Sequence, residues 1–203
     1  MNQLFRTSIA SLAIFVSACD AEDRKPANTP KPAAKDTTVK TEDLSKLSKE
    51  ELAKKLDPEA YRVCIMGGTE RPFANKYWNN HDEGIYVDVI SGKPLFASTT
   101  KFDSRSGWPA FFDPIDKAEI IEKTDYEIGY KRTEVVAKSS GAHLGHVFDD
   151  GFDYATGKAT PNGMRYCINS AALKFVAKDK LKEAGLEKYA HLFEGKSKKE
   201  GGK

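Results

Sequence analysis

Apolar and polar residues alternate along several short stretches in the middle of the chain, and this pattern predicts β-strands. Residues 85–90 (IYVDVI) are rich in β-branched and aromatic side chains and lead into the turn-forming sequence SGKP. Further strands are predicted within 119–122, 127–136, 143–148 and 164–176. The connections lack the long helical segments that parallel crossovers need, so we predict a mainly β fold with antiparallel sheets.

Helical patterns flank the predicted strands. Ser48–Glu51 has the form of a capping box, and the helix that it begins should stop before Pro58. A second short helix is predicted from Asp57 to Cys64. Near the C-terminus, residues 178–193 place their apolar side chains at amphipathic helical spacing: Leu181, Leu186, Tyr189 and Phe193. We therefore expect short peripheral N-terminal helices and one C-terminal helix.

Composition changes along the chain and divides it into four parts. The 203 residues are 39% hydrophobic and 31% charged, which suits one ordinary domain with appendages. We expect a signal peptide at 1–19, a flexible linker at 20–49, a β domain at 50–178, and a C-terminal helix and tail at 179–203. The net charge is only +2 and the lysines are scattered, so no nucleic-acid partner is expected.

The first 19 residues have the features of a secretory signal. Their apolar stretch, 9–18, is too short to span a bilayer, and it ends in Val-Ser-Ala-Cys. This ending resembles the lipobox of bacterial lipoproteins, which implies that Cys19 carries lipid and anchors the chain to a membrane. Asp20 then implies the periplasmic side of the inner membrane. The alternative is an ordinary cleaved signal with a chance cysteine.

The sequence GMRYCINS at 163–170 contains the most reactive pattern. On a strand, Arg165, Cys167 and Asn169 share one face. A neighbouring guanidinium favours the thiolate, which is the nucleophilic form of cysteine, and an amide can steer a substrate or hold a developing negative charge. Taken alone, these residues fit equally well a half-buried strand with an inert cysteine.

Five ordered blocks between residues 52 and 176 closely resemble the B-type methionine sulfoxide reductases. The blocks are GTERPF at 68–73, KFDS at 101–104, GWPAF at 107–111, AHLGHVFDDG at 142–151 and RYCINS at 165–170. The resemblance implies the β fold of that family and an oxidoreductase that converts methionine-R-sulfoxide, free or in proteins, to methionine.

The resemblance also implies a role for each matching residue. Cys167 is the thiolate that attacks the sulfoxide sulfur. Trp108 is the aromatic wall that receives the substrate methyl group. Apart from the resemblance, Phe111 and Phe112 suit an apolar pocket with Trp108, because sulfur–aromatic contacts are favourable. Arg165 lies close to the nucleophile and is grouped with the substrate-binding residues. The polar side of the pocket comprises three residues: His143, His146 and Asn169.

Histidine suits this chemistry, because a sulfoxide oxygen leaves readily only when it is protonated and imidazole titrates near neutral pH. His143 and His146 are three residues apart and would face opposite ways on a regular strand. We therefore expect a bulge at Gly145 that turns both inward. Each histidine alone also fits a structural role, and Trp108 alone fits a core aromatic residue.

With Cys19 assigned to lipid, Cys64 and Cys167 remain. In an oxidising compartment such a pair usually forms a structural disulfide. The resemblance implies instead that Cys64 is a resolving cysteine, which forms a disulfide with oxidised Cys167 for a thioredoxin-like partner to reduce. Some family members carry the resolving cysteine in the loop before the tryptophan, where this chain has only Ser104-Arg105-Ser106.

The chain departs from the family in two places. Many members hold a structural zinc with two Cys-x-x-Cys pairs, whose positions here are taken by four residues without a thiol: Asp88, Ser91, Ala137 and Ser140. We therefore expect no zinc and no other cofactor. The loop at 152–163 is longer than the common form, and it either shapes the mouth of the pocket or only extends the surface.

Two other functions fit parts of the sequence. One is a non-catalytic, membrane-tethered binding domain on the same scaffold. The other is a thiol hydrolase, because cysteine proteases also combine Cys, His and Asn, but this leaves Cys64 and the pocket aromatics unexplained. We expect a monomer whose partners are methionine-R-sulfoxide, a thioredoxin-like reductant and, through Cys19, a membrane.

Overall fold

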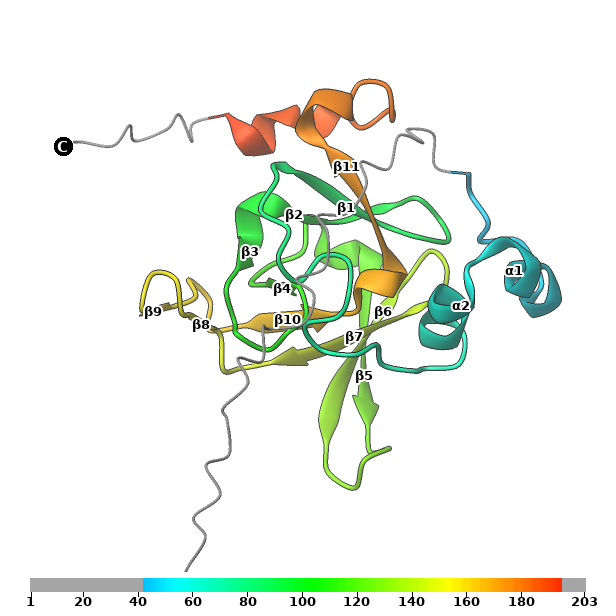
Figure 1. Cartoon of the computed structure of the whole chain (residues 1–203), viewed down its shortest axis with the longest axis horizontal. Helices are drawn as coiled ribbons and strands as arrows, with labels where there is room; N and C mark the ends of the chain where they lie inside the picture. The colour runs from blue at the N-terminus through cyan, green and yellow to red at the C-terminus, as the bar shows by residue number, and fades with distance from the viewer. Residues whose placement is uncertain (1–41, 195–203) are drawn as a thin grey trace, which may run out of the picture. The chain divides into compact units, whose positions relative to one another are not determined.

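The computed structural model describes residues 42–194 of the chain, and Figure 1 shows their arrangement. Two short α-helices, α1 (Lys49–Lys55) and α2 (Pro58–Cys64), precede every strand in this region. The strands pair only in antiparallel fashion, so the predicted mainly β fold is confirmed. Their bounds are β1 (Gly84–Asp88), β2 (Pro94–Ala97), β3 (Lys101–Phe102), β4 (Ala110–Phe111), β5 (Ile120–Asp125), β6 (Arg132–Ala137), β7 (His143–Phe148), β8 (Phe152–Asp153), β9 (Lys158–Ala159), β10 (Arg165–Ile168) and β11 (Leu173–Ala177).

These strands form three sheets. The largest has the order β3-β4-β10-β7-β6-β5, and a second has the order β11-β1-β2. Strands β8 and β9 form a separate hairpin. Strand β10, which carries Cys167, therefore lies inside the largest sheet, with β4 on one side and β7 on the other.

The two N-terminal helices begin where their capping residues predict. Ser48 and Glu51 form the reciprocal capping box before α1. Asp57 accepts a hydrogen bond from the backbone N–H of Ala60 at the start of α2, and Pro58 occupies the first turn. Local sequence therefore determines both helix starts.

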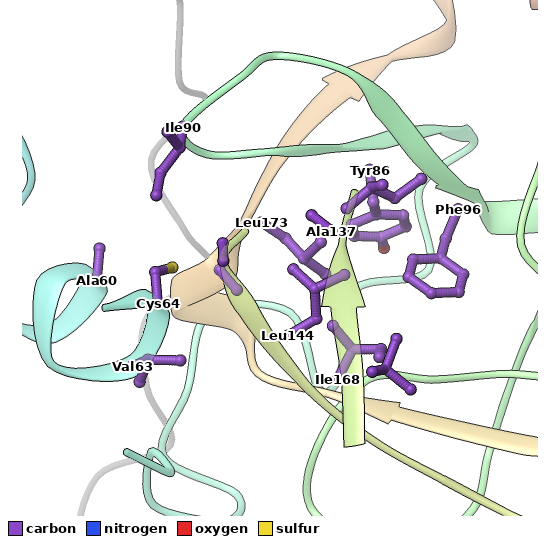
Figure 2. Close-up of a cluster of buried hydrophobic side chains, with 14 of the residues drawn as sticks. Ala60, Val63, Cys64, Tyr86, Ile90, Phe96, Ala137, Leu144, Ile168 and Leu173 are labelled. Carbon is purple, nitrogen blue, oxygen red and sulfur yellow. The ribbon is translucent and has the colours of Figure 1, made fainter. Parts of the chain in front are cut away.

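A buried aromatic cluster joins the two larger sheets. Phe111 of β4 stacks on Phe96 of β2 at a centroid distance of 4.6 Å, and Tyr86 of β1 meets Phe111 edge-on at 5.1 Å. Helix α2 covers another side of the same core (Figure 2), where the sulfur of Cys64 is turned inward from the helix. These contacts hold β10 and its neighbours in a fixed register against the rest of the domain.

The C-terminal segment is not the single helix that its spacing predicts. It contains two 3₁₀ segments, η4 (Lys178–Lys180) and η5 (Glu187–Phe193), with Gly185 at φ +70° between them. A left-handed residue cannot continue a right-handed helix, so the chain changes direction there. The apolar residues are nevertheless buried as predicted, in a cluster with Ile85 and Val87: Leu181, Leu186 and Phe193.

The N-terminal boundaries also need correction. The expected linker does not extend to residue 49, because Leu44 is buried and its N–H donates to the carbonyl of Ile90 at 2.8 Å. The expected signal peptide and Cys19 lie outside the described residues. Between residues 42 and 194, no helix is both long enough and apolar enough to cross a membrane.

Candidate active site

The central strand β10 presents Cys167 as the alternation predicts. Tyr166 and Ile168 are buried on one face, whereas Arg165 and Cys167 lie half-buried on the other. The register places Cys167 opposite His146 of β7 on one side and opposite Ala110 of β4 on the other. Residues paired directly across neighbouring strands share a face, so Cys167 and His146 belong to one surface.

The surroundings of the Cys167 thiol change its pKa in opposite directions. Burial raises its pKa, whereas the Ser106 hydroxyl and the Arg165 guanidinium act to lower it. The Ser106 Oγ lies 3.7 Å from the Cys167 Sγ. Arg165 thus acts in the predicted direction, but burial outweighs it and favours the neutral thiol at rest. Arg165 itself forms two 2.8 Å hydrogen bonds to Asp150 and lies over the ring of Phe148.

The predicted bulge at Gly145 is confirmed. The pairing of β6 with β7 shifts so that Val135 faces Gly145 and Val136 faces His143. Gly145 adopts φ +153°, and a Cβ added there would overlap the carbonyl oxygen of Cys167. The shift brings the rings of His143 and His146 together, with centroids 5.5 Å apart at an angle of 65°.

Each histidine is held by a carboxylate, but at a different ring nitrogen. His143 uses Nδ1 to contact Glu134 Oε1 at 2.7 Å, and its buried Nε2 has no hydrogen-bond partner within the described part of the chain. His146 uses Nε2 to contact Asp125 Oδ2 at 2.8 Å. His143 therefore has a free ring nitrogen for a further polar group.

The electrostatics of the second pair follow from burial and charge. Burial lowers the pKa of His146, and its contact with Asp125 opposes this effect. The backbone N–H of Glu127, followed by His146, lowers the pKa of Asp125 to about 2. Arg132 donates to the same Asp125 oxygen at 2.6 Å. The carboxylate therefore stays ionised and fixes the orientation of the His146 ring.

Glu70 links the remaining predicted residues. Its backbone carbonyl accepts a hydrogen bond from Trp108 Nε1 at 3.1 Å, and its backbone N–H donates to Asn169 Oδ1 at 3.1 Å. Its buried carboxylate accepts from the backbone N–H groups of Ser170 and Ala171. Burial outweighs these bonds and raises the pKa of Glu70 to about 7. One residue thus holds both the aromatic and the amide side chain.

Asn169 is more enclosed than the sequence suggests. It is 3% exposed, and its Nδ2 donates to the carbonyl of Leu144 at 3.0 Å. Together with the bond to Glu70, this ties the end of β10 to β7 and to the segment after α2. Both polar atoms of the Asn169 side chain are thus occupied by backbone partners in this structure.

Phe111 does not belong to the pocket, and this prediction is wrong. Phe111 pairs with Tyr166 and Ala110 pairs with Cys167, so the aromatic ring points to the face away from the thiol. Phe111 is fully buried in the aromatic core. Trp108, by contrast, is half-buried and lies two residues from Ser106 beside Cys167.

The long loop at 152–163 supports the loop that carries Ser106. The backbone N–H of Tyr154 donates to the carbonyl of Asp103 at 2.8 Å, and the N–H of Asp103 donates to Asp153 Oδ1 at 3.3 Å. The Arg105 guanidinium lies over the Tyr154 ring at 4.9 Å. Hairpin β8–β9 therefore braces the segment between β3 and Trp108.

Both cysteines of the described region are free thiols. Cys64 is 3% exposed in the core beneath α2, and burial raises its pKa. Cys167 is half-buried in the sheet beside Ser106. A bond between the two sulfurs therefore requires a change from this conformation.

The residues at the zinc positions do not fit that metal. Asp88 is fully buried and accepts hydrogen bonds from the Ser91 hydroxyl at 2.5 Å and from two backbone N–H groups. Ala137 has no donor atom in its side chain, and Ser140 accepts from the N–H of Ala142. No group of three or more His, Cys, Asp or Glu residues able to hold a metal occurs within 42–194. The absence of zinc stays a prediction.

Sequence reasoning missed the residues that orient the recognised ones. Glu134, Asp125 and Arg132 lie on β5 and β6, and only the strand register places them beside the histidines. Asp150 and Glu70 lie inside two of the blocks that resemble the family, AHLGHVFDDG and GTERPF. Their place in these blocks was the one feature of the sequence that pointed to a role in the site.

The comparisons with known proteins agree with this site. The SelR domain matches residues 56–177. A similar protein is the peptide methionine sulfoxide reductase MsrA/MsrB of Vibrio cholerae serotype O1, 47% identical over 146 residues, which are 72% of this chain. The chain spans only 37% of the length of that relative. Because the SelR match covers more than half of the chain, the chain belongs to the SelR domain family, the B-type methionine sulfoxide reductases.

Proposed function

We propose that this chain reduces methionine-R-sulfoxide to methionine, with Cys167 as the nucleophile and His143 as the acid. The observation that carries the proposal is the free, buried Nε2 of His143 on the strand that neighbours Cys167. Its other nitrogen is held by Glu134, so the ring cannot turn away. A proton on Nε2 is therefore directed at a group bound in the pocket.

The reaction balances with these groups. The Cys167 sulfur attacks the sulfoxide sulfur, whose oxygen takes a proton from His143. The S–O bond of the substrate then breaks and oxygen passes to Cys167, which gives methionine and a sulfenic acid. The thiol proton of Cys167 restores His143. Burial raises the pKa of Cys167 and so favours the neutral thiol at rest. Ser106 and Arg165 act in the opposite direction and stabilise the attacking thiolate.

Conversion of the Cys167 sulfenic acid back to a thiol requires a second thiol. Cys64 attacks the sulfenic sulfur, water leaves, and a Cys64–Cys167 disulfide forms. A thioredoxin-like dithiol then reduces this disulfide by exchange. The buried position of Cys64 makes this step the one that needs a conformational change.

Single substitutions of the histidines test the assignment of the acid. His143→Ala should lower kcat on methionine-R-sulfoxide by about 10²–10⁴-fold, the usual loss for a general acid. His146→Ala should cost less, because its Nε2 already contacts Asp125. Alkylation of Cys167 by iodoacetamide serves as the control and should persist in both variants. Equal turnover of His143→Ala and the parent would contradict the proposal.

We also propose that the chain acts as a monomer attached to a membrane through lipid on Cys19, on the periplasmic side of the inner membrane. Support comes from the Val-Ser-Ala-Cys sequence and the polar stretch after it. Mass spectrometry of the native protein should detect lipid on Cys19. An unmodified cysteine, or cleavage elsewhere, would contradict this part.

A further inference from the structure

The turn between β5 and β6 exposes three large apolar side chains. Tyr126 is 64% exposed, Ile128 is 51% exposed and Tyr130 is 61% exposed. Turns of this kind usually carry polar residues, and Gly129 adopts the positive φ, +87°, that glycine favours. Three exposed apolar residues within five positions form a patch of the kind that marks an interaction site.

The turn is continuous with the proposed active site. Asp125, the last residue of β5, contacts His146, and Tyr126 follows it directly. Arg132, the first residue of β6, pairs with Asp125 at the other end of the turn. The hairpin therefore presents its apolar tip from the same strands whose carboxylates orient the two histidines.

The register gives the distance between nucleophile and turn. Cys167 lies opposite His146, which lies opposite Glu134, which lies opposite Lys123. Three strand spacings of about 4.8 Å each give about 14 Å across the sheet, and two residues from Lys123 to Asp125 add about 7 Å along β5. The turn thus begins about 16 Å from the backbone of Cys167 on the same sheet.

The strand that leads into the turn forms an edge of the largest sheet. Strand β5 is last in the sheet order, and within the described residues no strand pairs with its outer edge. The side chains of residues 121–124 are exposed. An exposed edge strand is able to bind an extended polypeptide by backbone hydrogen bonding.

We propose that the Tyr126–Tyr130 turn binds an apolar side chain of an unfolded polypeptide while its methionine sulfoxide occupies the Cys167 site. The inference rests on the proposed function and specifies its substrate. An extended chain rises about 3.3 Å per residue, so the bound side chain is about five residues from the oxidised methionine. Folded proteins bury such side chains, so the substrate is an unfolded or damaged protein segment.

Substrate length and composition test this proposal. The first substrate is a peptide of about fifteen residues with a central methionine-R-sulfoxide. It carries Leu about five residues to either side, the separation estimated from the rise of an extended chain. The second has Ser in place of each Leu, and the third is N-acetyl-methionine-R-sulfoxide. The enzyme variants are Tyr126→Ser/Ile128→Ser/Tyr130→Ser and, as a control on the same hairpin, Ile121→Ser, whose side chain is 38% exposed.

The parent chain should favour the Leu peptide over the Ser peptide by about tenfold in kcat/KM, through KM, as expected for burying one apolar side chain. The triple variant should lose this preference and keep its rate on N-acetyl-methionine-R-sulfoxide. Ile121→Ser should behave as the parent does. All comparisons use dithiothreitol, so that no protein reductant contributes.

Three results would overturn the docking proposal. The first is an equal loss on all three substrates, which would mean that the turn only supports the fold. The second is an undiminished Leu preference in the triple variant. The third is a dimer of the parent chain in sedimentation that the triple variant abolishes, since a second copy would then cover the turn. If the parent reduces none of the substrates, the proposed function fails first and the docking proposal fails with it.

Discussion

Replacement of Gly145 by alanine should move strand β7, which carries the two histidines, away from strand β10, which carries Cys167. The added Cβ would overlap the carbonyl oxygen of Cys167 and lie 3.1 Å from the Cα of Ile168. Both neighbours are backbone atoms of β10, so no side-chain rotation relieves the contact. Strands β7 and β10 must move apart, and with them His146 and Cys167, which face each other across this pairing.

The expected cost has two parts. Forcing extra atoms into a packed region costs about 1–3 kcal/mol. The φ of +153° belongs to a region that is essentially restricted to glycine, and a side chain there costs a further 1–3 kcal/mol or so. The free energy of unfolding should therefore fall by about 2–6 kcal/mol. A displacement of the reacting groups by about 1 Å should lower kcat by about 100-fold.

Gly157→Ala provides a matched control. Gly157 also has a positive φ, +69°, but nothing lies within 4 Å of its hypothetical Cβ. This variant contains backbone strain without the overlap and should keep normal kcat. Urea unfolding and reduction of methionine-R-sulfoxide with dithiothreitol should be measured for both variants. If Gly145→Ala retains the stability and kcat of Gly157→Ala, the bulge does not position the histidines as argued.

Three further expectations follow from the site. Burial raises the pKa of Glu70 to about 7 from an ordinary value of 4.5, so its stabilising effect is complete below about pH 4.5 and is lost as the pH rises through about 7. Glu70→Gln should remove that part of the pH dependence of unfolding, and an unchanged profile would contradict the assignment. Cys64→Ser should stop turnover with a thioredoxin system but not with dithiothreitol, whereas full thioredoxin-linked turnover would exclude Cys64 as the resolving residue. Metal analysis should find no zinc, and stoichiometric zinc with a chelator-sensitive melting temperature would refute the reading of Asp88, Ser91, Ala137 and Ser140.

Some features were predictable because they depend on neighbours in the sequence. The caps at Ser48 and Asp57 are local, and so is the alternation that places Arg165 and Cys167 on one face. The bulge at Gly145 was predictable because two histidines three residues apart cannot share a face on a regular strand. Local sequence was sufficient for the caps and for the alternation. The bulge also needed the requirement that both histidines face the thiol.

Other features depend on register and burial, which local sequence does not contain. Ala110 and Phe111 are adjacent, and only the pairing with β10 decides that Ala110 faces the thiol while Phe111 enters the core. Glu134 contacts His143 through cross-strand pairing. The resting protonation of Cys167 depends on its burial, which outweighs the neighbouring Arg165. The prediction of one C-terminal helix was wrong because Gly185 adopts a left-handed conformation. The spacing of apolar residues alone does not reveal that conformation.

The central claim is that Cys167 itself accepts the oxygen of methionine-R-sulfoxide. A single-turnover reaction of the Cys64→Ser variant without reductant, followed by peptide mass spectrometry, tests it most directly. With the R epimer, we expect about one methionine per chain and one added oxygen atom on Cys167, because no resolving thiol removes it. With the S epimer, we expect neither product. Methionine released from the R epimer without oxygen on Cys167, or equal reaction of both epimers, would contradict the account.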